Sequence, residues 1–498
     1  MTARGREKMP HFVYYKAHSK EFYMYTAITL GAAAVLSTAL LLIFAKRTDD
    51  LFYKVLKGIT VAFCAVGFFR FMLSDGFIYV INGGVMDGTY YEKQDAFSAI
   101  LRWGYFANYS ILPMAVFTKS RLFKNLACYY CLPFSVLSAV FFEKFMVYFT
   151  QRANGIYLDP ALRYPYFVLE LVLAISIVAL VCIREKHVIN VKDPKELIRF
   201  FVSLPFIAIT TMPVYVPQSI IGYSKLVIKS YSPMHFVWIG LIIVVTFVLY
   251  RMFRFRPKED RYNLCLFLTF ALFFHYNSLY LMGFSLPRLP IQLCNLAAFF
   301  YIIAIPFKMR KFFEFCFIVN ITGTLIAILS PDFAVTGLGF WNLHYIFEHT
   351  IVFMVPVLAM GLRIFPHITR RSLKYAAIGY VSYFIFCIIG GGLLNALSGY
   401  TGQEVNYFFM FDLDKAESFV KAIKAADVWP VIIGDYTFYP ILMIVVFFAF
   451  ALLCLAFYRF TFYCYKVEKD NLQLRNAGLD ILEQRLGRPT KFQREFPD

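Results

Sequence analysis

Charged residues are scarce in this sequence of 498 residues. Asp, Glu, Lys and Arg together make up 16% of it, whereas hydrophobic residues make up 60% and aromatic residues 19%. Soluble domains average about 25% charged and about 45–50% apolar residues. The apolar residues gather in blocks such as 26–45 and 440–457, which are long enough to cross the ~30 Å hydrocarbon core of a bilayer. This composition excludes a soluble enzyme, a disordered chain and a soluble nucleic-acid-binding protein, and it predicts a multi-pass membrane protein.

Signals of processing and of cysteine-based sites are also missing. Residues 1–21 are polar and precede an apolar stretch too long for a signal-peptide core, so we expect no cleavable signal peptide. The ten cysteines lie mostly inside apolar segments, which argues against a disulfide framework. Cys128 and Cys131 form a CxxC pair with no second Cys or His pair nearby, so we interpret them as packing residues. We therefore predict no metal site and no cofactor.

Acidic residues are outnumbered, 31 against 49 basic residues, which gives a net charge of +18. The basic residues cluster in short loops between apolar blocks, and acidic or nearly neutral loops such as 87–95 and 330–342 alternate with them. This alternation is the positive-inside pattern of membrane proteins, so we expect anionic membrane lipids as partners and no nucleic acid. Placing the basic loops inside predicts an N-terminus outside and a C-terminus in the cytoplasm.

Hydropathy predicts an all-α polytopic fold with about thirteen transmembrane helices. The expected spans are residues 24–45, 59–82, 98–118, 124–147, 164–183, 199–217, 233–250, 263–283, 292–307, 311–330, 343–362, 373–394 and 437–460. After the last span, residues 466–486 have the apolar spacing of an amphipathic helix, which we expect to contact a protein partner or the membrane surface.

Weak similarity between the two halves indicates an internal duplication. Residues 67–77 (GFFRFMLSDGF) parallel residues 272–284 (LFFHYNSLYLMGF). Residues 119–128 (KSRLFKNLAC) parallel residues 308–316 (KMRKFFEFC). The repeat unit is six spans long, so both copies share one orientation and the duplication is parallel, with six and seven helices. The predicted regions are an N-terminal tail at 1–23, a degenerate six-helix repeat at 24–222, a seven-helix domain at 231–465 and a C-terminal tail at 466–498.

Ionisable side chains inside apolar segments are costly to bury in a membrane, so each is a candidate functional residue. The ionisable candidates are Arg70, Asp75, Glu170, His275, Glu348 and His349. Gln292 and Cys294 are added as polar members of an apolar helix. Arg70, Asp75 and Glu170 lie in the first half and have two open interpretations. Arg70 forms an ion pair with an acidic neighbour, or the three residues form a separate binding site.

Cys294, His275 and His349 are expected in the same leaflet. Cys294 lies just inside the outer end of its span, and the two histidines lie about two to three turns inside theirs. A cysteine becomes a strong nucleophile when a neighbouring histidine takes its proton, and such a pair suits acyl transfer through a thioester. The alternative is that Cys294 is a packing residue and each histidine bonds a neighbouring helix.

Short motifs in the second half resemble those of known families. Residues 289–294 (LPIQLC) resemble the LPxHLC signature of bacterial YwaF-like membrane proteins. Residues 344–349 (HYIFEH), followed by Val355-Pro356, are similar to the YYIQH…VVP stretch of the animal transmembrane-protein-164 acyltransferases. Looser matches recur in the families' order, at YSPMH 231–235, at Asp332 within SPD 330–332, at Asn406-Tyr407 and at Trp429-Pro430. The resemblance covers about residues 231–465.

The resemblance implies an intramembrane acyltransferase or transacylase acting on glycerophospholipids, with His349 in the family's histidine position. We predict Cys294 as nucleophile and His349 as general base. Supporting roles are predicted for His275, Glu348, Gln292, Asp332 and Asn406. Two departures stand out, because Gln292 replaces the histidine of the YwaF motif and Ile291 occupies the slot of the animal proteins' reactive cysteine. Cys294 lies one turn later on the same helix face.

Two other functions stay open. A transporter of lipids or small molecules would use the duplication and the buried Arg70, Asp75 and Glu170. A receptor or assembly protein would act through the tail at 466–498. A transporter should tolerate loss of Cys294, whereas an acyltransferase should need both Cys294 and His349.

Overall fold

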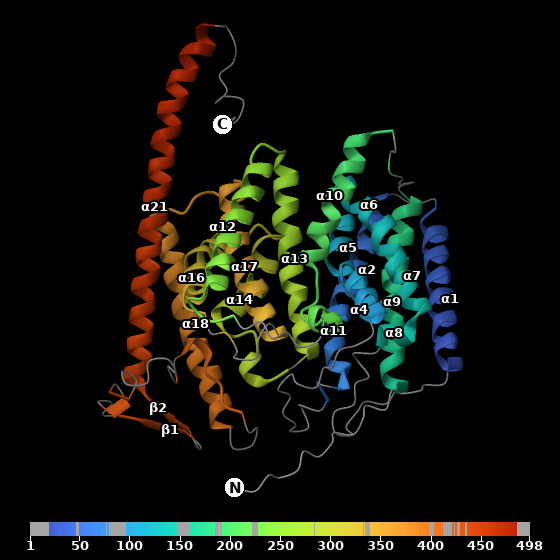
Figure 1. Cartoon of the computed structure of the whole chain (residues 1–498), viewed down its shortest axis with the longest axis horizontal. Helices are drawn as coiled ribbons and strands as arrows, with labels where there is room; N and C mark the ends of the chain where they lie inside the picture. The colour runs from blue at the N-terminus through green and yellow to red at the C-terminus, as the bar shows by residue number, and fades with distance from the viewer. Residues whose placement is uncertain are drawn as a thin grey trace.

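The computed structural model describes residues 19–45, 49–75, 77–78, 96–146, 160–184, 189, 192–221, 228–282, 284–331, 333, 339–397, 403–409, 411, 421–422, 424–425, 429–433 and 436–485. These residues are almost entirely helical, which confirms the all-α class (Figure 1). One small hairpin departs from it, because strands β1 (Val431–Ile433) and β2 (Tyr436–Phe438) pair antiparallel with Val431 opposite Phe438.

Nine helical segments among the described residues are long and apolar enough to cross a membrane. They are formed by α1 (Ser19–Phe44), α2 (Asp49–Phe69) with η1 (Arg70–Leu73), α9 (Pro160–Arg184), α12 (Pro233–Phe253), α13 (Lys258–Met282), α15 (Arg310–Phe315) with η4 (Cys316–Asn320) and α16 (Ile321–Leu329), α17 (Phe340–Gly361), α18 (Arg370–Ala396) and the first part of α21 (Pro440–Arg485). Each carries at least one long apolar stretch, as expected for a multi-pass membrane protein.

The count of thirteen spans is not confirmed, because four predicted spans are short or broken. They correspond to α4 (Ala96–Phe106) with α5 (Asn108–Phe117), α6 (Arg121–Leu126) with η2 (Ala127–Cys131), α7 (Leu132–Val140) and α8 (Phe142–Met146), α10 (Pro194–Thr210), and α14 (Leu293–Ala304). A hydropathy profile detects an apolar run but not the points within it at which a helix ends. Helix α14, for example, follows the 3₁₀ turn η3 (Leu286–Arg288) and begins at Leu293, within one residue of the predicted span at 292–307, but it ends at Ala304 after 12 residues.

Equivalent helices pack in the same way in both halves. Helix α9 contacts α1, α2, α5 and α7, and its counterpart α17 contacts α12, α13, α14 and α16. The π-helical segments η2 and η4 begin at Ala127 and Cys316, each eight residues after the lysine that opens the aligned sequences, Lys119 and Lys308. These shared features support the duplication, while the boundaries of the four regions remain predictions.

Helix α13 lies at the junction of the two halves (Figure 1). It packs on α2, η1 and α5 of the first half and on α14 and α17 of the second. Across this junction the rings of Phe68 and Phe273 stack with 4.6 Å between their centroids. Helix α13 therefore contacts both bundles.

Helix α21 is one continuous helix of 46 residues. At ~1.5 Å per residue it is about 69 Å long, roughly twice the ~30 Å hydrocarbon core. Its end projects well beyond the other helices (Figure 1). The expected last span and the expected helix at 466–486 thus form a single element, and residues 486–498 lie outside the described residues.

The interpretation of Cys128 as only a packing residue is wrong. Cys128 in η2 forms a disulfide with Cys182 in α9, with 6.2 Å between their Cα atoms. The remaining eight cysteines are free, and Cys131 is fully buried. Pairing of residues 54 positions apart depends on the tertiary contact between η2 and α9, which sequence spacing does not reveal.

Candidate functional site

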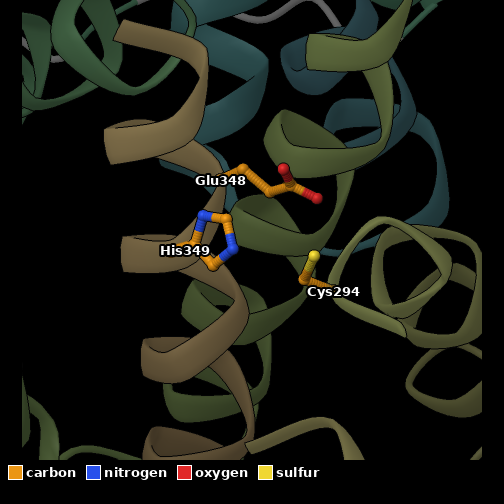
Figure 2. Close-up of side chains that lie close together, drawn as sticks. All are labelled: Cys294, Glu348 and His349. Carbon is orange, nitrogen blue, oxygen red and sulfur yellow. The ribbon is translucent and has the colours of Figure 1, made fainter. Parts of the chain in front are cut away.

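Helices α14 and α17 bring Cys294, Glu348 and His349 together. Their sulfur, carboxylate and imidazole ligand atoms all lie within 4.8 Å of one another (Figure 2). Cys294 stands in the first turn of α14, and the other two residues lie in the middle of α17. Both α17 residues are almost completely buried. The predicted nucleophile and base therefore meet, although they are 55 residues apart in the chain.

The environment of His349 determines which ring nitrogen carries its proton. The Nδ1 atom lies 2.7 Å from the carbonyl oxygen of Tyr345, one turn earlier on α17. A carbonyl oxygen only accepts hydrogen bonds, so Nδ1 carries a proton. The Tyr345 ring also packs against the imidazole, with 4.0 Å between centroids. In the neutral form of His349 the lone pair therefore lies on Nε2, which can accept a proton.

The Cys294 thiol forms a hydrogen bond with the side chain of Asn295. The sulfur lies 3.2 Å from Asn295 Oδ1, so the thiol donates to that oxygen. Because a thiol is a weak donor, this is a weak hydrogen bond. In Figure 2 the sulfur points from α14 toward α17, where Glu348 and His349 lie.

Glu348 is anchored by two donors. The hydroxyl of Tyr276 donates to its Oε1, and Nε2 of His344 lies 3.2 Å from its Oε2. On its other side His344 Nδ1 lies 2.8 Å from Nε2 of His275. When neutral His344 donates to Glu348 through Nε2, its Nδ1 accepts a hydrogen bond from His275 Nε2. The three side chains then form one chain of hydrogen bonds, with each donor pointing toward Glu348. His275 therefore supports the site through His344 rather than by touching Cys294.

Sequence reasoning missed His344 and Tyr276. His344 precedes Glu348 by four residues, and that spacing places both on one helix face, so the HYIFE run contained the signal. Tyr276 carried no such signal, because its contact with Glu348 depends on how α13 packs on α17.

Gln292 and Asn406 brace the start of α14. The amide nitrogen of Gln292 donates to the backbone carbonyl of Asn406 over 3.0 Å, and its oxygen accepts from the backbone N–H of Phe408 over 2.8 Å. Asn406 Oδ1 accepts from the N–H of Phe411 over 3.1 Å. Both predicted supporting residues thus connect η5 (Tyr407–Phe409) to the helix that carries Cys294. Asp332 lies outside the described residues.

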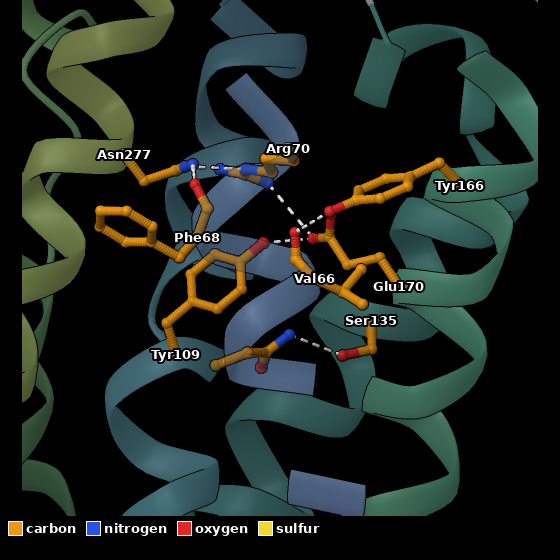
Figure 3. A network of polar contacts seen from close by, with 9 residues as sticks. Val66, Phe68, Arg70, Tyr109, Ser135, Tyr166, Glu170 and Asn277 are labelled. Carbon is orange, nitrogen blue, oxygen red and sulfur yellow. Dashed lines mark hydrogen bonds and ion pairs between the residues drawn. The ribbon is translucent and has the colours of Figure 1, made fainter. Parts of the chain in front are cut away.

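In the first half, Arg70 and Glu170 form a buried ion pair. Nη1 of Arg70 lies 3.4 Å from Oε1 of Glu170, and the Tyr109 hydroxyl donates to the same oxygen (Figure 3). Arg70 Nε also donates to Asn277 Oδ1 on α13 over 2.9 Å. Of the two open interpretations of Arg70, these contacts match the ion pair with an acidic neighbour.

Asp75 does not join that cluster. It pairs with Arg163 at the start of α9, and both side chains are at most 2% exposed. Arg163 was not a sequence candidate, since it lies just before the expected span at 164–183. The three first-half candidates thus belong to two separate buried ion pairs.

Cys294, Glu348 and His349 also have the donor types of a zinc site. Thiolate sulfur, imidazole nitrogen and carboxylate oxygen are the three ligand types that Zn²⁺ takes in proteins. Their mutual distances within 4.8 Å are compatible with one shared ion. The zinc content of the purified protein is therefore one test of this site.

The second half matches a known family. Residues 230–458 match the model of the TMEM164 family, a stretch that contains Cys294, Glu348 and His349. No curated protein and no solved structure matches the chain. The expected resemblance to the transmembrane-protein-164 proteins is confirmed, whereas the resemblance to YwaF-like proteins stays a prediction.

Proposed function

We propose that this multi-pass membrane protein transfers fatty acyl groups between glycerophospholipids, with Cys294 as nucleophile and His349 as general base. The observation that carries the proposal is that the Cys294 sulfur lies within 4.8 Å of a ligand nitrogen of His349. The Nδ1 atom of this imidazole is hydrogen-bonded to the Tyr345 carbonyl. That arrangement leaves Nε2 free to take the thiol proton. The match of residues 230–458 to the TMEM164 family supports the same site.

In the first step His349 Nε2 takes the thiol proton and the Cys294 sulfur attacks the ester carbonyl carbon of a donor phospholipid. The bond from that carbon to the glycerol oxygen breaks, and the imidazolium returns the proton to this oxygen. The products are a lysophospholipid and an acyl thioester on Cys294. In the second step the hydroxyl of an acceptor lysophospholipid gives its proton to Nε2 and attacks the thioester, and the thiol is restored.

Glu348 would stabilise the charge that forms on His349. Its carboxylate lies within 4.8 Å of the imidazole ligand atom, and Tyr276 and His344 hold it in place. A buried negative charge at this distance favours the imidazolium over the neutral ring. The role is electrostatic, because Nδ1 of His349 is bonded to the Tyr345 carbonyl rather than to Glu348.

The proposal includes a topology, with the N-terminus outside and the C-terminus in the cytoplasm, on the strength of the basic loops. The reacting groups then lie in the outer leaflet, away from cytosolic acyl-CoA. A membrane phospholipid is therefore the proposed donor. A strictly CoA-dependent activity would contradict this part of the proposal.

The test is a transfer assay with purified protein in lipid nanodiscs that contain phosphatidylcholine with a labelled acyl chain and an unlabelled lysophospholipid. We expect labelled acceptor with the wild type and none with Cys294→Ala or His349→Ala. Cys316→Ala, which alters another buried free cysteine of the second half, is the matched control and should retain transfer. Metal analysis of the same samples separates the alternatives, since stoichiometric zinc lost in Cys294→Ala would favour a metal centre instead.

The buried Arg70–Glu170 pair favours a second candidate, a transporter of lipids or small molecules. Charges inside a membrane bundle often mark a transport pathway, and this pair lies beside α13 at the junction of the halves. A transport assay in proteoliposomes that is abolished by Glu170→Gln and unaffected by Cys294→Ala would establish that function in place of acyl transfer.

A further inference from the structure

Arg288 lies six residues before Cys294, in the segment that precedes α14. It ends η3, between α13 and α14, and precedes the Gln292 that caps α14. Its guanidinium carbon lies 3.3 Å from the centroid of the Trp341 ring, in the first turn of α17. The side chain is half-buried, and this burial lowers the pKa of Arg288 to about 10. Since that value is well above neutral pH, the guanidinium remains charged.

Among the described residues, Arg288 has neither an acidic partner nor a hydrogen-bond acceptor for its guanidinium. Arg70, Arg163, Arg184 and Arg310, by contrast, each pair with a carboxylate within 4.0 Å. Partial burial of an unpaired cation is unfavourable, and an anionic ligand would offset that cost. A guanidinium presents five donors in a planar fork that matches the oxygens of a phosphate group.

A row of side chains leads from Arg288 to the reacting groups. Trp341, His344 and Glu348 recur three or four residues apart and so share one face of α17. Trp341 and Glu348 are seven residues apart, which is about 10 Å along the helix at ~1.5 Å per residue. In a glycerophospholipid only the glycerol backbone separates the phosphate from the ester carbonyls. A phosphate held over Trp341 would therefore place an ester near Glu348 and Cys294.

The segment that carries Arg288 is fixed in position. The backbone N–H of Leu286 donates to Gln403 Oε1 over 2.8 Å, and the Tyr407 hydroxyl donates to the Leu286 carbonyl over 2.5 Å. The guanidinium is thus presented on an anchored turn rather than on a loose loop, which reduces the entropy lost on binding.

We propose that Arg288, stacked on Trp341, binds the phosphate of the donor glycerophospholipid and so directs one of its esters to Cys294. The assignment of the ester to Cys294 rests on the proposed acyl transfer, whereas the phosphate contact does not. Arg288 would then select donors by their phosphate and distinguish a phospholipid from a neutral diacylglycerol.

The test is a binding titration that needs no catalysis. Purified protein in detergent is titrated with an ether-linked dialkyl phosphatidylcholine, which has no acyl ester to transfer, and with the dialkylglycerol that lacks the phosphate. Arg288→Gln should weaken binding of the phospholipid by ~10-fold or more, while Arg288→Lys retains part of the affinity. Binding of the neutral lipid should be equal in all variants.

Arg254 supplies a matched control. Its guanidinium also lies over an aromatic ring, that of Phe255 at 4.1 Å, but it follows α12 at the opposite end of α13. Arg254→Gln should therefore leave phospholipid binding unchanged. Unaltered phospholipid binding by Arg288→Gln, or an equal loss for both lipids, would overturn the proposal. A selective loss in a protein that forms no acyl-Cys294 would uphold the phosphate site and refute acyl transfer.

Discussion

Asn277 accepts a hydrogen bond from Arg70 across the junction of the two halves, with 2.9 Å between Oδ1 and Nε. Its amide nitrogen donates to the carbonyl of Phe68, so both ends of this side chain contact the first half. The preceding residue, Tyr276, donates to Glu348 in the second half. Helix α13 is therefore held by polar contacts on both sides, and the first half orients the helix on which the Cys294 group is built.

Replacing Asn277 by Leu should destabilise the protein. The substitution keeps the branching of the side chain at Cγ but leaves Arg70 Nε without this acceptor in a buried position, a loss of about 1–3 kcal/mol. Thermal unfolding in detergent micelles measures it. Thr269→Val is the control, because its hydroxyl bonds the Cys265 carbonyl within α13 itself. Equal losses in the two variants would contradict a specific role at the junction.

Glu348→Gln should slow acyl transfer by about 10²-fold, the scale reported for loss of one preorganised electrostatic group in an active site. The amide oxygen can still accept from Tyr276, so the fold is retained while the charge beside His349 is removed. Single-turnover transfer in nanodiscs measures the effect. Glu314→Gln, which alters a buried carboxylate paired with Arg310 on α15, should leave the rate unchanged. A wild-type rate for Glu348→Gln would refute the electrostatic role.

The Asp75–Arg163 pair predicts a non-additive result. Arg163→Met alone leaves the Asp75 carboxylate without its buried partner, which should cost about 3–5 kcal/mol of stability. Adding Asp75→Leu removes the remaining charge and should recover much of that loss. Unfolding of the two single variants and the double variant tests this coupling. A double variant as unstable as the sum of the singles would show that the two residues act independently.

The Cys128–Cys182 disulfide predicts a defined thiol count. Alkylation of the unfolded protein should modify eight cysteines before reduction and ten after it. Mass spectrometry of the intact chain gives both numbers. A Cys128→Ala, Cys182→Ala double variant should show the same count in both conditions. Ten reactive thiols in the unreduced wild type would mean that the pair is not bonded.

The long apolar blocks were predictable from sequence because their signal is local. Segments such as α12 and α17 are apolar enough to stand out from their own residues alone. The length of α14 was not, because the helix begins within one residue of the predicted span at 292–307 but ends at Ala304. Hydropathy counted a full span where the chain forms a helix of only 12 residues.

The candidate site was predictable as a set of residues but not as a set of contacts. Depth along each span placed Cys294 and His349 in one leaflet, and their contact required the packing of α14 on α17. The partner of Asp75 was missed for the same reason, because Arg163 on α9 was not a sequence candidate. Pairing between helices is a property of the tertiary fold, which a single sequence does not encode in its spacing.

Mass spectrometry of the protein itself tests the central claim most directly. Wild-type protein is incubated with phosphatidylcholine in nanodiscs, quenched and digested, and the peptide containing Cys294 is examined for an acyl adduct removable by hydroxylamine. The account predicts an acyl thioester on Cys294 in the wild type that fails to form in His349→Ala. A Cys294 peptide that stays unmodified while lysophospholipid acceptors are still acylated would contradict it.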